Sequence, residues 1–297
     1  MNGKRSRADI DWGASPTIIV ASIRAKARIL QTPCLNGTVL WHQWPGPSIH
    51  PPLVLIHGGW GSWTHWIKSI IALSKTRTVY AVDIPGMGGS GDVGQPVIVT
   101  PIADVITQGI DQLIPNTTYD LAGFSFGGIV AAHVAVRHRT RCRSFTAVGA
   151  AGFGEMHFVV EGIKLPDIEL SNEDKNSIHR ENLKLLMLAN DDNIDPLAIH
   201  IHRTNIEQGR MRSRRISLTT SLIEALPKIK SRIGGIWGER DTTGNGIAMI
   251  EKRRDIFRDI QPDCPFDIIP NGGHWVMYEE PKKFVETLLK HLAVHAE

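Results

Sequence analysis

Residues 120–135, DLAGFSFGGIVAAHVA, place one serine between an apolar run and an Ala/Val-rich run. The first run predicts a buried strand and the second a helix, so Ser125 is expected on the turn that joins them. Gly123 and Gly127 complete the pattern G-x-S-x-G, in which the serine occupies a tight, strained turn and a Cβ at either glycine would clash. Such a turn holds the hydroxyl at the carboxyl end of the sheet, above the partial positive charge of the helix N-terminus.

The same alternation of short apolar runs and helix-length stretches extends over most of the chain. The apolar runs are rich in β-branched residues, end at Gly or Pro, and occupy residues 51–61, 77–91, 119–123, 142–152, 233–241 and 265–274. Helical stretches lie at about residues 63–74, 102–113, 125–137, 247–260 and 281–291, the last with Pro281 in its first turn. Strands that are buried on both faces and alternate with helices predict an α/β fold with a mostly parallel central sheet flanked by helices.

The alternation stops between residues 155 and 230. This segment shows helical periodicity without a strand pattern, and it interrupts the sheet between two strands. We therefore predict one α/β core, formed by residues 1–154 and 231–297, with residues 155–230 inserted as a helical cap.

Composition argues against several classes of protein. The chain has 297 residues, 42% of them hydrophobic, and its charge of +3 arises from 33 basic and 30 acidic residues, so no overall field attracts nucleic acid. The cysteines, Cys34, Cys142 and Cys264, are widely spaced, which argues for a reducing compartment. No run reaches the length of a membrane span, and the apolar stretch TIIVASI is too short for a signal core. We predict a cytoplasmic protein without membrane or nucleic-acid partners, and the sequence leaves homo-oligomer formation open.

Two residues that could activate the serine follow it in the chain. His274 lies in NGGHW after the last predicted strand, and Asp241 lies in WGERD after the strand before it. A serine hydroxyl is a weak nucleophile that needs a base, and the base needs an orienting carboxylate. The order Ser125, Asp241, His274 is the one expected when three loops leave the same edge of such a sheet. Glu239 and Asp267 are nearby alternatives for the carboxylate.

These motifs, together with HGGW (residues 57–60) and DIPGMGGSG (residues 83–91), resemble those of the α/β-hydrolase family over nearly the whole chain. The resemblance implies a Ser-His-Asp hydrolase that uses no metal or organic cofactor. Carried over by position, Ser125 would be the nucleophile, His274 the general base and acid, and Asp241 the residue that orients His274.

The resemblance also implies an oxyanion hole and a pocket. The backbone amides of Gly59 and Phe126 would be the oxyanion donors, with Trp60 in place of Gly59 if the loop is shifted by one residue. A cap over the sheet edge would create a mostly apolar substrate pocket that includes Trp60 and Phe124. The tryptophans Trp60, Trp63 and Trp66 near this loop could equally belong to the core.

The function that the resemblance implies is hydrolysis of a carboxylic ester or related acyl bond of a small, partly apolar substrate. The cap and C-terminal motif look most like those of hydrolases of small aromatic-derived molecules, including carbon–carbon bond hydrolases of ring-cleavage products. Those enzymes commonly carry asparagine just before the nucleophile, where this chain has Phe124. Acyl transfer and a non-hydrolytic ligand-binding protein are further alternatives. Epoxide hydrolases and haloalkane dehalogenases are disfavoured because they use aspartate at the position of Ser125.

Other motifs carry weaker signals. GMGGSG (residues 86–91) matches G-x-G-x-x-G, but no helix pattern follows it, so a dinucleotide site is not expected. DDNIDP (residues 191–196) lacks the glycine of a calcium loop, and His200 and His202 would point to different sides of a helix, so no metal site is predicted. RMRSRR (residues 210–215) is the strongest basic run and is either a solvated face of the cap, a gate for anionic substrates or a polymer contact.

Overall fold

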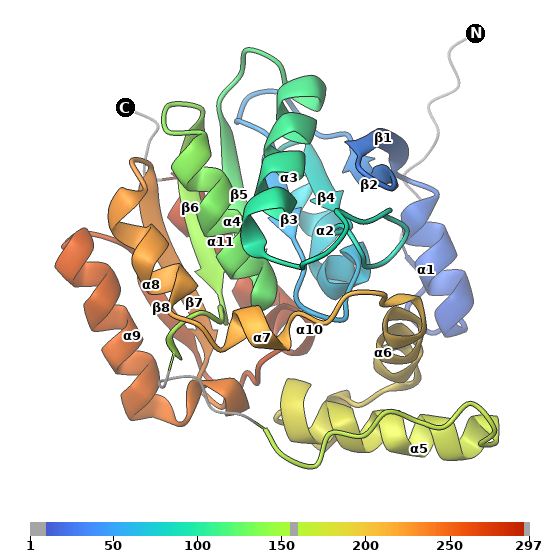
Figure 1. The fold of residues 1–297 in the computed structure, drawn as a ribbon. Coiled ribbons are helices and arrows are strands. Elements are labelled where there is room, and N and C mark those ends of the chain that lie inside the picture. Colours follow the sequence, from blue (N-terminus) through green and yellow to red (C-terminus); the bar gives the residue numbers. More distant parts are fainter. Residues whose placement is uncertain (1–9, 155–159, 294–297) are drawn as a thin grey trace, which may run out of the picture.

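The structure, a computed structural model, describes residues 10–154 and 160–293 (Figure 1). Within them an eight-stranded sheet has the order β1-β2-β4-β3-β5-β6-β7-β8. Strands β3 to β8 run parallel, whereas β2 pairs antiparallel with both β1 and β4. The strands are β1 (Arg28–Cys34), β2 (Gly37–Trp44), β3 (Leu53–Ile56), β4 (Val79–Val82), β5 (Tyr119–Phe124), β6 (Cys142–Val148), β7 (Arg232–Gly238) and β8 (Phe266–Ile269).

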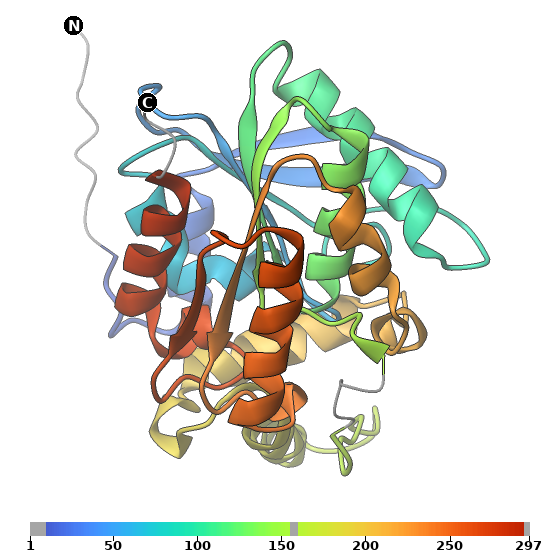
Figure 2. The ribbon, with the colours of Figure 1, turned by 90° about the vertical axis from the view of Figure 1, so that its left-hand side faces the viewer.

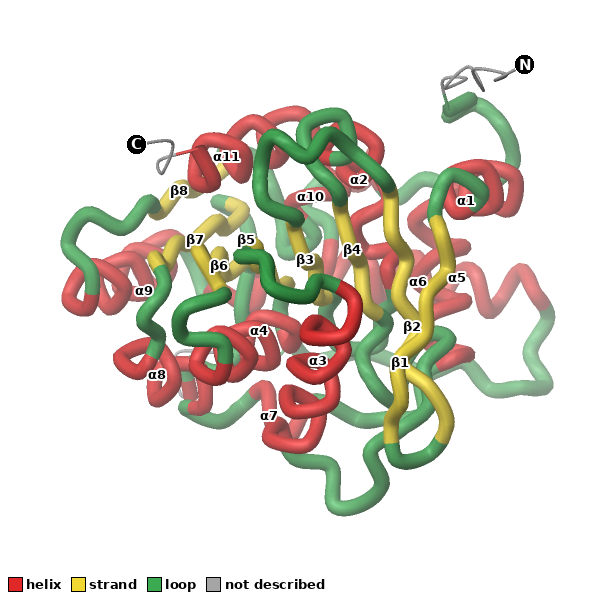
Figure 3. Tube along the Cα trace, turned by 90° about the horizontal axis from the view of Figure 1, so that it is seen from above, coloured by secondary structure: helices red, strands yellow, loops and turns green. Residues whose placement is uncertain are grey.

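Helices cover both faces of this sheet, as the view along it shows (Figure 3). Successive side chains of a strand point to opposite faces, so Val54 and Ile56 of β3 join one hydrophobic core and Leu53 and Leu55 join the other. The first core is closed by α3 (Val99–Leu113), α4 (Phe126–Arg137), α8 (Ser221–Ala225) and α9 (Ile247–Ile260). The second is closed by α1 (Pro16–Arg24), α2 (Ile67–Leu73), α10 (Val276–Glu279) and α11 (Pro281–Ala293).

The prediction of a mostly parallel sheet flanked by helices is confirmed, but the first elements of the chain were missed. Helix α1 and the hairpin of β1 and β2 precede the first predicted strand. Strand β1 lies at the edge of the sheet and most of its side chains are exposed or half-buried, so it lacks the apolar run that marks the buried strands. Its turn to β2 ends at Gly37, whose φ of 105° favours glycine.

Between β6 and β7 the described residues form several helices joined by loops, and no strand. This segment contains α5 (Asn172–Asn182), a π-helical turn (Leu183–Met187), α6 (Pro196–Gln208), α7 (Arg214–Ser217) and α8. Helices α5 and α6 lie beyond one end of the sheet in both side views (Figure 1, Figure 2). Helix α8 instead packs against α4 within the first core. The boundaries of a separate cap at residues 155 and 230 therefore stay a prediction.

None of the helices in residues 10–154 and 160–293 combines the length and the apolar character that crossing a membrane requires. The thiols of Cys34, Cys142 and Cys264 are all free.

A buried charge cluster links β5, β6 and the residues just before β4, at the end of the sheet where β5 begins. Asp120 is fully buried, and its carboxylate accepts hydrogen bonds from Arg77 Nη1 at 2.6 Å, Arg143 Nε at 2.9 Å and Ser144 Oγ at 2.6 Å. Arg77 itself is only 2% exposed. Removing one partner of such a cluster leaves an uncompensated buried charge.

We expect Asp120→Ala to lower the free energy of unfolding by about 3–5 kcal/mol, because Arg77 would then be buried without its counter-ion. Urea denaturation of both proteins measures this loss. The matched control is Asp104→Ala, which removes a carboxylate that is 45% exposed from its pair with Arg137 and should cost less than about 1 kcal/mol. Equal losses in the two variants would contradict the prediction.

Candidate active site

Ser125 occupies the turn between β5 and α4 with φ 51° and ψ −120°. This positive φ is unusual for a residue with a Cβ and costs on the order of 1–3 kcal/mol. Backbone hydrogen bonds hold the turn: the Ser125 amide donates to Val148 O at 2.9 Å, and its carbonyl accepts from Gly128 N at 2.9 Å and Ala151 N at 3.1 Å. The surrounding chain therefore keeps the serine in a conformation that it would not adopt alone.

The expected need for glycine on both sides of Ser125 is confirmed. A Cβ on Gly127 would lie 2.1 Å from the carbonyl oxygen of His57, and a Cβ on Gly123 would lie 2.4 Å from that of Gly127. Both contacts are with backbone, which cannot rotate away as a side chain can. Helix α4 can thus approach the ends of β3 and β5 only if these positions lack side chains.

The structure brings Ser125, His274 and Asp241 into one hydrogen-bonded series. His274 Nδ1 lies 3.0 Å from both carboxylate oxygens of Asp241, and His274 Nε2 lies 3.1 Å from Ser125 Oγ. Because a carboxylate can only accept, Nδ1 carries the ring proton and donates to it. The lone pair of Nε2 then faces the serine hydroxyl, which donates to it.

The two alternative carboxylates lie elsewhere. Glu239 Oε2 accepts from the Asn271 amide at 3.0 Å, and Asp267 pairs with His291 Nε2 at 2.7 Å. Asp241 is the carboxylate that contacts His274.

Thr243, which sequence analysis missed, supports Asp241. Its amide and its hydroxyl both donate to Asp241 Oδ1 at 2.8 Å. Burial by itself would raise the pKa of Asp241, but His274, Thr243 and the charge of Arg253 outweigh burial and lower it. Arg253 also donates to the Thr243 carbonyl at 3.0 Å. The signal in the sequence is the threonine two residues after the aspartate, where its amide can close a turn on the carboxylate.

His57 links the loop after β3 to the loop after β4 through hydrogen bonds. Its Nε2 accepts from the Ile84 amide at 2.9 Å, so Nδ1 carries the proton and donates to Gly58 O at 2.7 Å. The ring is fully buried, and burial lowers the pKa of His57 to about 4. The histidine therefore shapes the HGGW loop as a neutral group.

A cavity of about 220 Å³ opens beside Ser125 and His274. The three predicted oxyanion residues, Gly59, Phe126 and Trp60, all line it, and so does Phe124. Residues of the inserted segment close the other side, where Ser213 Oγ lies 2.4 Å from the position of a Cβ on Gly59. Most of the wall is apolar and includes Ile163, Leu186, Met187 and Leu218.

The three tryptophans near this loop have different roles. Trp60 has a φ of 50° and lines the cavity. Trp66 is fully buried and contacts the rings of Phe124 and Phe284, and Trp63 is 5% exposed and packs against Trp44. Only Trp60 of these three faces the site.

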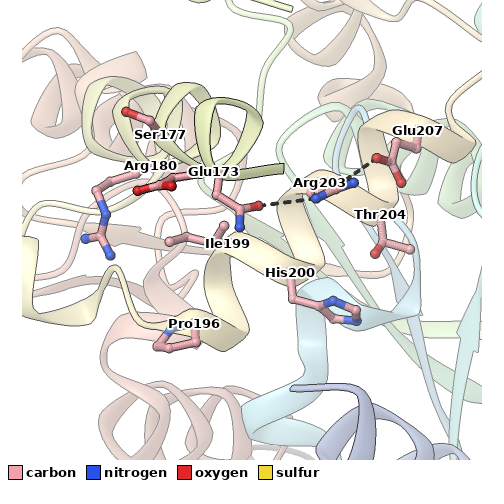
Figure 4. A pocket seen from close by; sticks show the side chains of 10 residues that line it. Glu173, Ser177, Arg180, Pro196, Ile199, His200, Arg203, Thr204 and Glu207 are labelled. Carbon is pink, nitrogen blue, oxygen red and sulfur yellow. Dashed lines mark hydrogen bonds and ion pairs between the residues drawn. The ribbon is translucent and has the colours of Figure 1, made fainter. Parts of the chain in front are cut away.

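A larger hollow of about 700 Å³ lies between α5 and α6, away from Ser125 (Figure 4). Its lining is mainly polar and charged, with Arg203 pairing with Glu207 at 2.8 Å. His200 lines this hollow, whereas the neighbouring His202 contacts His179 on α5 at 3.0 Å, so the two histidines do point to different sides. Size alone does not locate a site, and this groove contains no hydrogen-bonded nucleophile and base.

The remaining motifs are used structurally. After GMGGSG no helix begins until Val99, and the nearby Asp83 accepts from the amides of Trp63 at 2.8 Å and Gly89 at 3.0 Å. In DDNIDP, Asp195 caps α6 by accepting from Ala198 N at 2.8 Å. Across residues 10–154 and 160–293, no group of three or more His, Cys, Asp or Glu side chains is arranged to hold a metal ion.

Comparison with known proteins places this chain in a family. A model described as the alpha/beta hydrolase family matches residues 53–287, from β3 into α11. The chain belongs to the alpha/beta hydrolase family. Curated relatives of this hydrolase include the pimeloyl-(acyl-carrier protein) methyl ester esterase of Proteus mirabilis, which is 26% identical over 259 aligned residues that cover 80% of this chain and 91% of that protein. For several other curated relatives the chain spans only about a third of their length.

Solved structures of hydrolases share the fold. A naproxen esterase (carboxylesterase NP) from Bacillus subtilis superposes with a TM-score of 0.71 at 19% identity, over 93% of this chain and 96% of that chain. A meta-cleavage product hydrolase from Pseudomonas fluorescens gives a TM-score of 0.67 at 20% identity, over 86% of this chain and 93% of that chain. The predicted α/β-hydrolase fold is therefore confirmed.

The neutral, buried state of His57 predicts a pH-dependent contribution to stability. Its folded pKa of about 4 lies below the ordinary 6.5, so the contribution is complete above pH 6.5 and is lost as the pH falls toward 4. We expect the difference in unfolding free energy between the wild type and His57→Gln to shrink by on the order of 2 kcal/mol from pH 7.5 to pH 4.5. Urea denaturation at several pH values measures it. The exposed His50→Gln is the control, and a difference for His57→Gln that stays constant with pH would show the prediction to be wrong.

Proposed function

We propose that this alpha/beta hydrolase is a serine hydrolase that cleaves a carboxylic ester or related acyl bond through an acyl-enzyme. The observation that carries the proposal is the series Ser125, His274 and Asp241, which meets an apolar cavity at the serine hydroxyl. A half-buried hydroxyl, followed by a buried imidazole and a buried carboxylate, supplies a nucleophile, a base and an orienting group.

In the first half-reaction, Ser125 Oγ attacks the carbonyl carbon of the substrate, and its proton passes to His274 Nε2. Negative charge then develops on the carbonyl oxygen. The backbone amides of Phe126 and Gly59 would donate hydrogen bonds to this oxygen, with the amide of Trp60 as the alternative to that of Gly59. His274 returns the proton to the departing alkoxide, which leaves as an alcohol. Asp241 holds the ring in the required tautomer and stabilises its protonated form.

In the second half-reaction, water replaces the alcohol. His274 Nε2 takes a proton from water, the resulting hydroxide attacks the acyl carbon, and Ser125 Oγ leaves and recovers its proton from His274. The products are a carboxylic acid and the free serine. Apart from the substrate and water, these steps use only groups of this chain.

The apolar wall of the cavity favours a small, partly apolar substrate, with Trp60 and Phe124 as contacts. The inserted helical segment would act as the cap that excludes water from it. An esterase assignment is supported by the Proteus mirabilis relative and by the Bacillus subtilis structure, both of which are named as esterases.

Carbon–carbon bond hydrolysis is the second candidate, because a meta-cleavage product hydrolase shares the fold. Phe124 argues against it: this side chain is apolar and packs 4.9 Å from the ring of His274, where it cannot hydrogen-bond to a substrate oxygen.

We expect Ser125→Ala to lower the rate of p-nitrophenyl acetate and butyrate hydrolysis by at least about 10³-fold and to abolish any burst of nitrophenolate, because the acyl-enzyme cannot form. Stopped-flow absorbance of both proteins measures the burst and the turnover. The matched control is Ser74→Ala, which removes the serine hydroxyl directly after α2. This variant should hydrolyse both esters at the wild-type rate.

The wild type and Ser125→Ala should also differ in covalent labelling by a serine-directed phosphonate. Mass spectrometry is expected to find the wild type labelled at Ser125 and Ser125→Ala unlabelled. A wild type that neither turns over nor labels would contradict the proposal and favour a ligand-binding protein. Turnover of a dienol ketone by the wild type, without turnover of esters, would favour carbon–carbon bond hydrolysis.

Thr243 provides a finer test of the support for Asp241, because its hydroxyl donates to that carboxylate. We expect Thr243→Val to lower kcat/KM about tenfold, since one hydrogen bond to a buried carboxylate is lost. Thr243→Ser keeps the hydroxyl and should restore most of the rate. Similar losses in both variants would mean that packing, not the hydrogen bond, is what the threonine supplies.

A further inference from the structure

The basic run at residues 210–215 divides into structural and free members. The Arg210 guanidinium donates to the carbonyls of Ser90 and Gln208, which ties the run to the loop after β4. Met211 and Ser213 are buried, whereas Arg212, Arg214 and Arg215 are exposed. Of these three, Arg214 also lines the cavity beside Ser125.

Arg214 is the one fully charged side chain among the described residues that line this cavity. The rest of the described wall is apolar or carries hydroxyl groups, apart from His274, and no carboxylate belongs to it. No described carboxylate lies within ion-pair distance of Arg214. Its side chain is exposed, so it stands at the rim while Ser125 lies deeper. An arginine at the rim of an apolar cavity, with no counter-ion among residues 10–154 and 160–293, has its charge available to a ligand.

We propose that the substrate carries a carboxylate at the end remote from the scissile bond and that Arg214 binds it. The proposal rests on the proposed acyl hydrolysis and names its substrate class: half-esters with an apolar spacer. One guanidinium matches one carboxylate in charge and can bind both oxygens with two parallel N–H donors. The apolar side chains that line the same cavity would contact the spacer.

The test compares matched esters. Monomethyl half-esters of linear dicarboxylic acids, from succinate to suberate, are paired with methyl esters of monocarboxylic acids of the same carbon number, and kcat/KM is measured by pH-stat. The scan of chain length finds the spacer that joins Ser125 to Arg214. The proteins are the wild type, Arg214→Gln, Arg214→Lys and, as the matched control, Arg215→Gln, which removes an equal charge that is exposed but does not line the cavity.

At the chain length for which the wild type most prefers the half-ester, we expect the ratio of kcat/KM for the half-ester to that for its neutral partner to fall about three- to tenfold in Arg214→Gln. This is the effect expected from losing one charge-assisted contact at a partly exposed site. Arg214→Lys should retain part of the preference and Arg215→Gln all of it. Added salt should weaken the preference in the wild type and not in Arg214→Gln. An unchanged preference in Arg214→Gln at every length overturns the proposal.

A binding measurement separates this proposal from the proposed function. In a Ser125→Ala background, half-ester binding is followed by tryptophan fluorescence, since Trp60 lines the same cavity. Weaker binding in Ser125→Ala/Arg214→Gln than in Ser125→Ala supports the anion site. This holds even if the wild type hydrolyses no ester, because that result would overturn only the proposed function. Equal binding in both proteins overturns the anion site.

Discussion

The close approach of α4 to the ends of β3 and β5 is the constraint on which the site depends. With backbone oxygens where the Cβ atoms of Gly123 and Gly127 would lie, helix and strands meet without side chains between them. That contact forces Ser125 into a positive φ, and hydrogen bonds from the neighbouring loops hold it there. The strain in one residue is stabilised by a packed interface, which explains how a serine hydroxyl can stand at a fixed place at the edge of the sheet.

Buried charged groups lie at both ends of this sheet. Asp120 with its arginines holds the strands together at the end where β5 begins, remote from the turn at Ser125. At the other end Asp241 is buried and ionised because His274 and Thr243 donate to it. His57 is kept neutral there by burial. Hydrogen-bond partners thus accompany both the ionised carboxylate of Asp241 and the neutral ring of His57.

The cavity is built by parts of the chain that are far apart in sequence. Its floor comes from the ends of the strands, and its upper wall from the inserted segment, including Met187, Ser213 and Arg214. Because the proposed nucleophile and base lie at the sheet edge and the wall above them comes from a separate segment, different parts of the chain would determine the reaction and the substrate. The charge of Arg214 and the apolar side chains around it are the features of that wall that would discriminate among acyl compounds.

Much of this organisation was predictable from local patterns. The buried strands are apolar runs because both faces of a parallel sheet are covered. The glycines on both sides of Ser125 predict its turn, because a residue with a Cβ does not fit at those positions. The order of Ser125, Asp241 and His274 follows from loops that leave one edge. The hairpin of β1 and β2 was not predicted, since an exposed edge strand needs no apolar run. The choice of Asp241 over Glu239, the contact of Thr243 with the carboxylate, and the place of Arg214 on the cavity were decided by tertiary structure. Each depends on distances between segments that are separated along the chain, and the periodicity of a single segment carries no information about those distances.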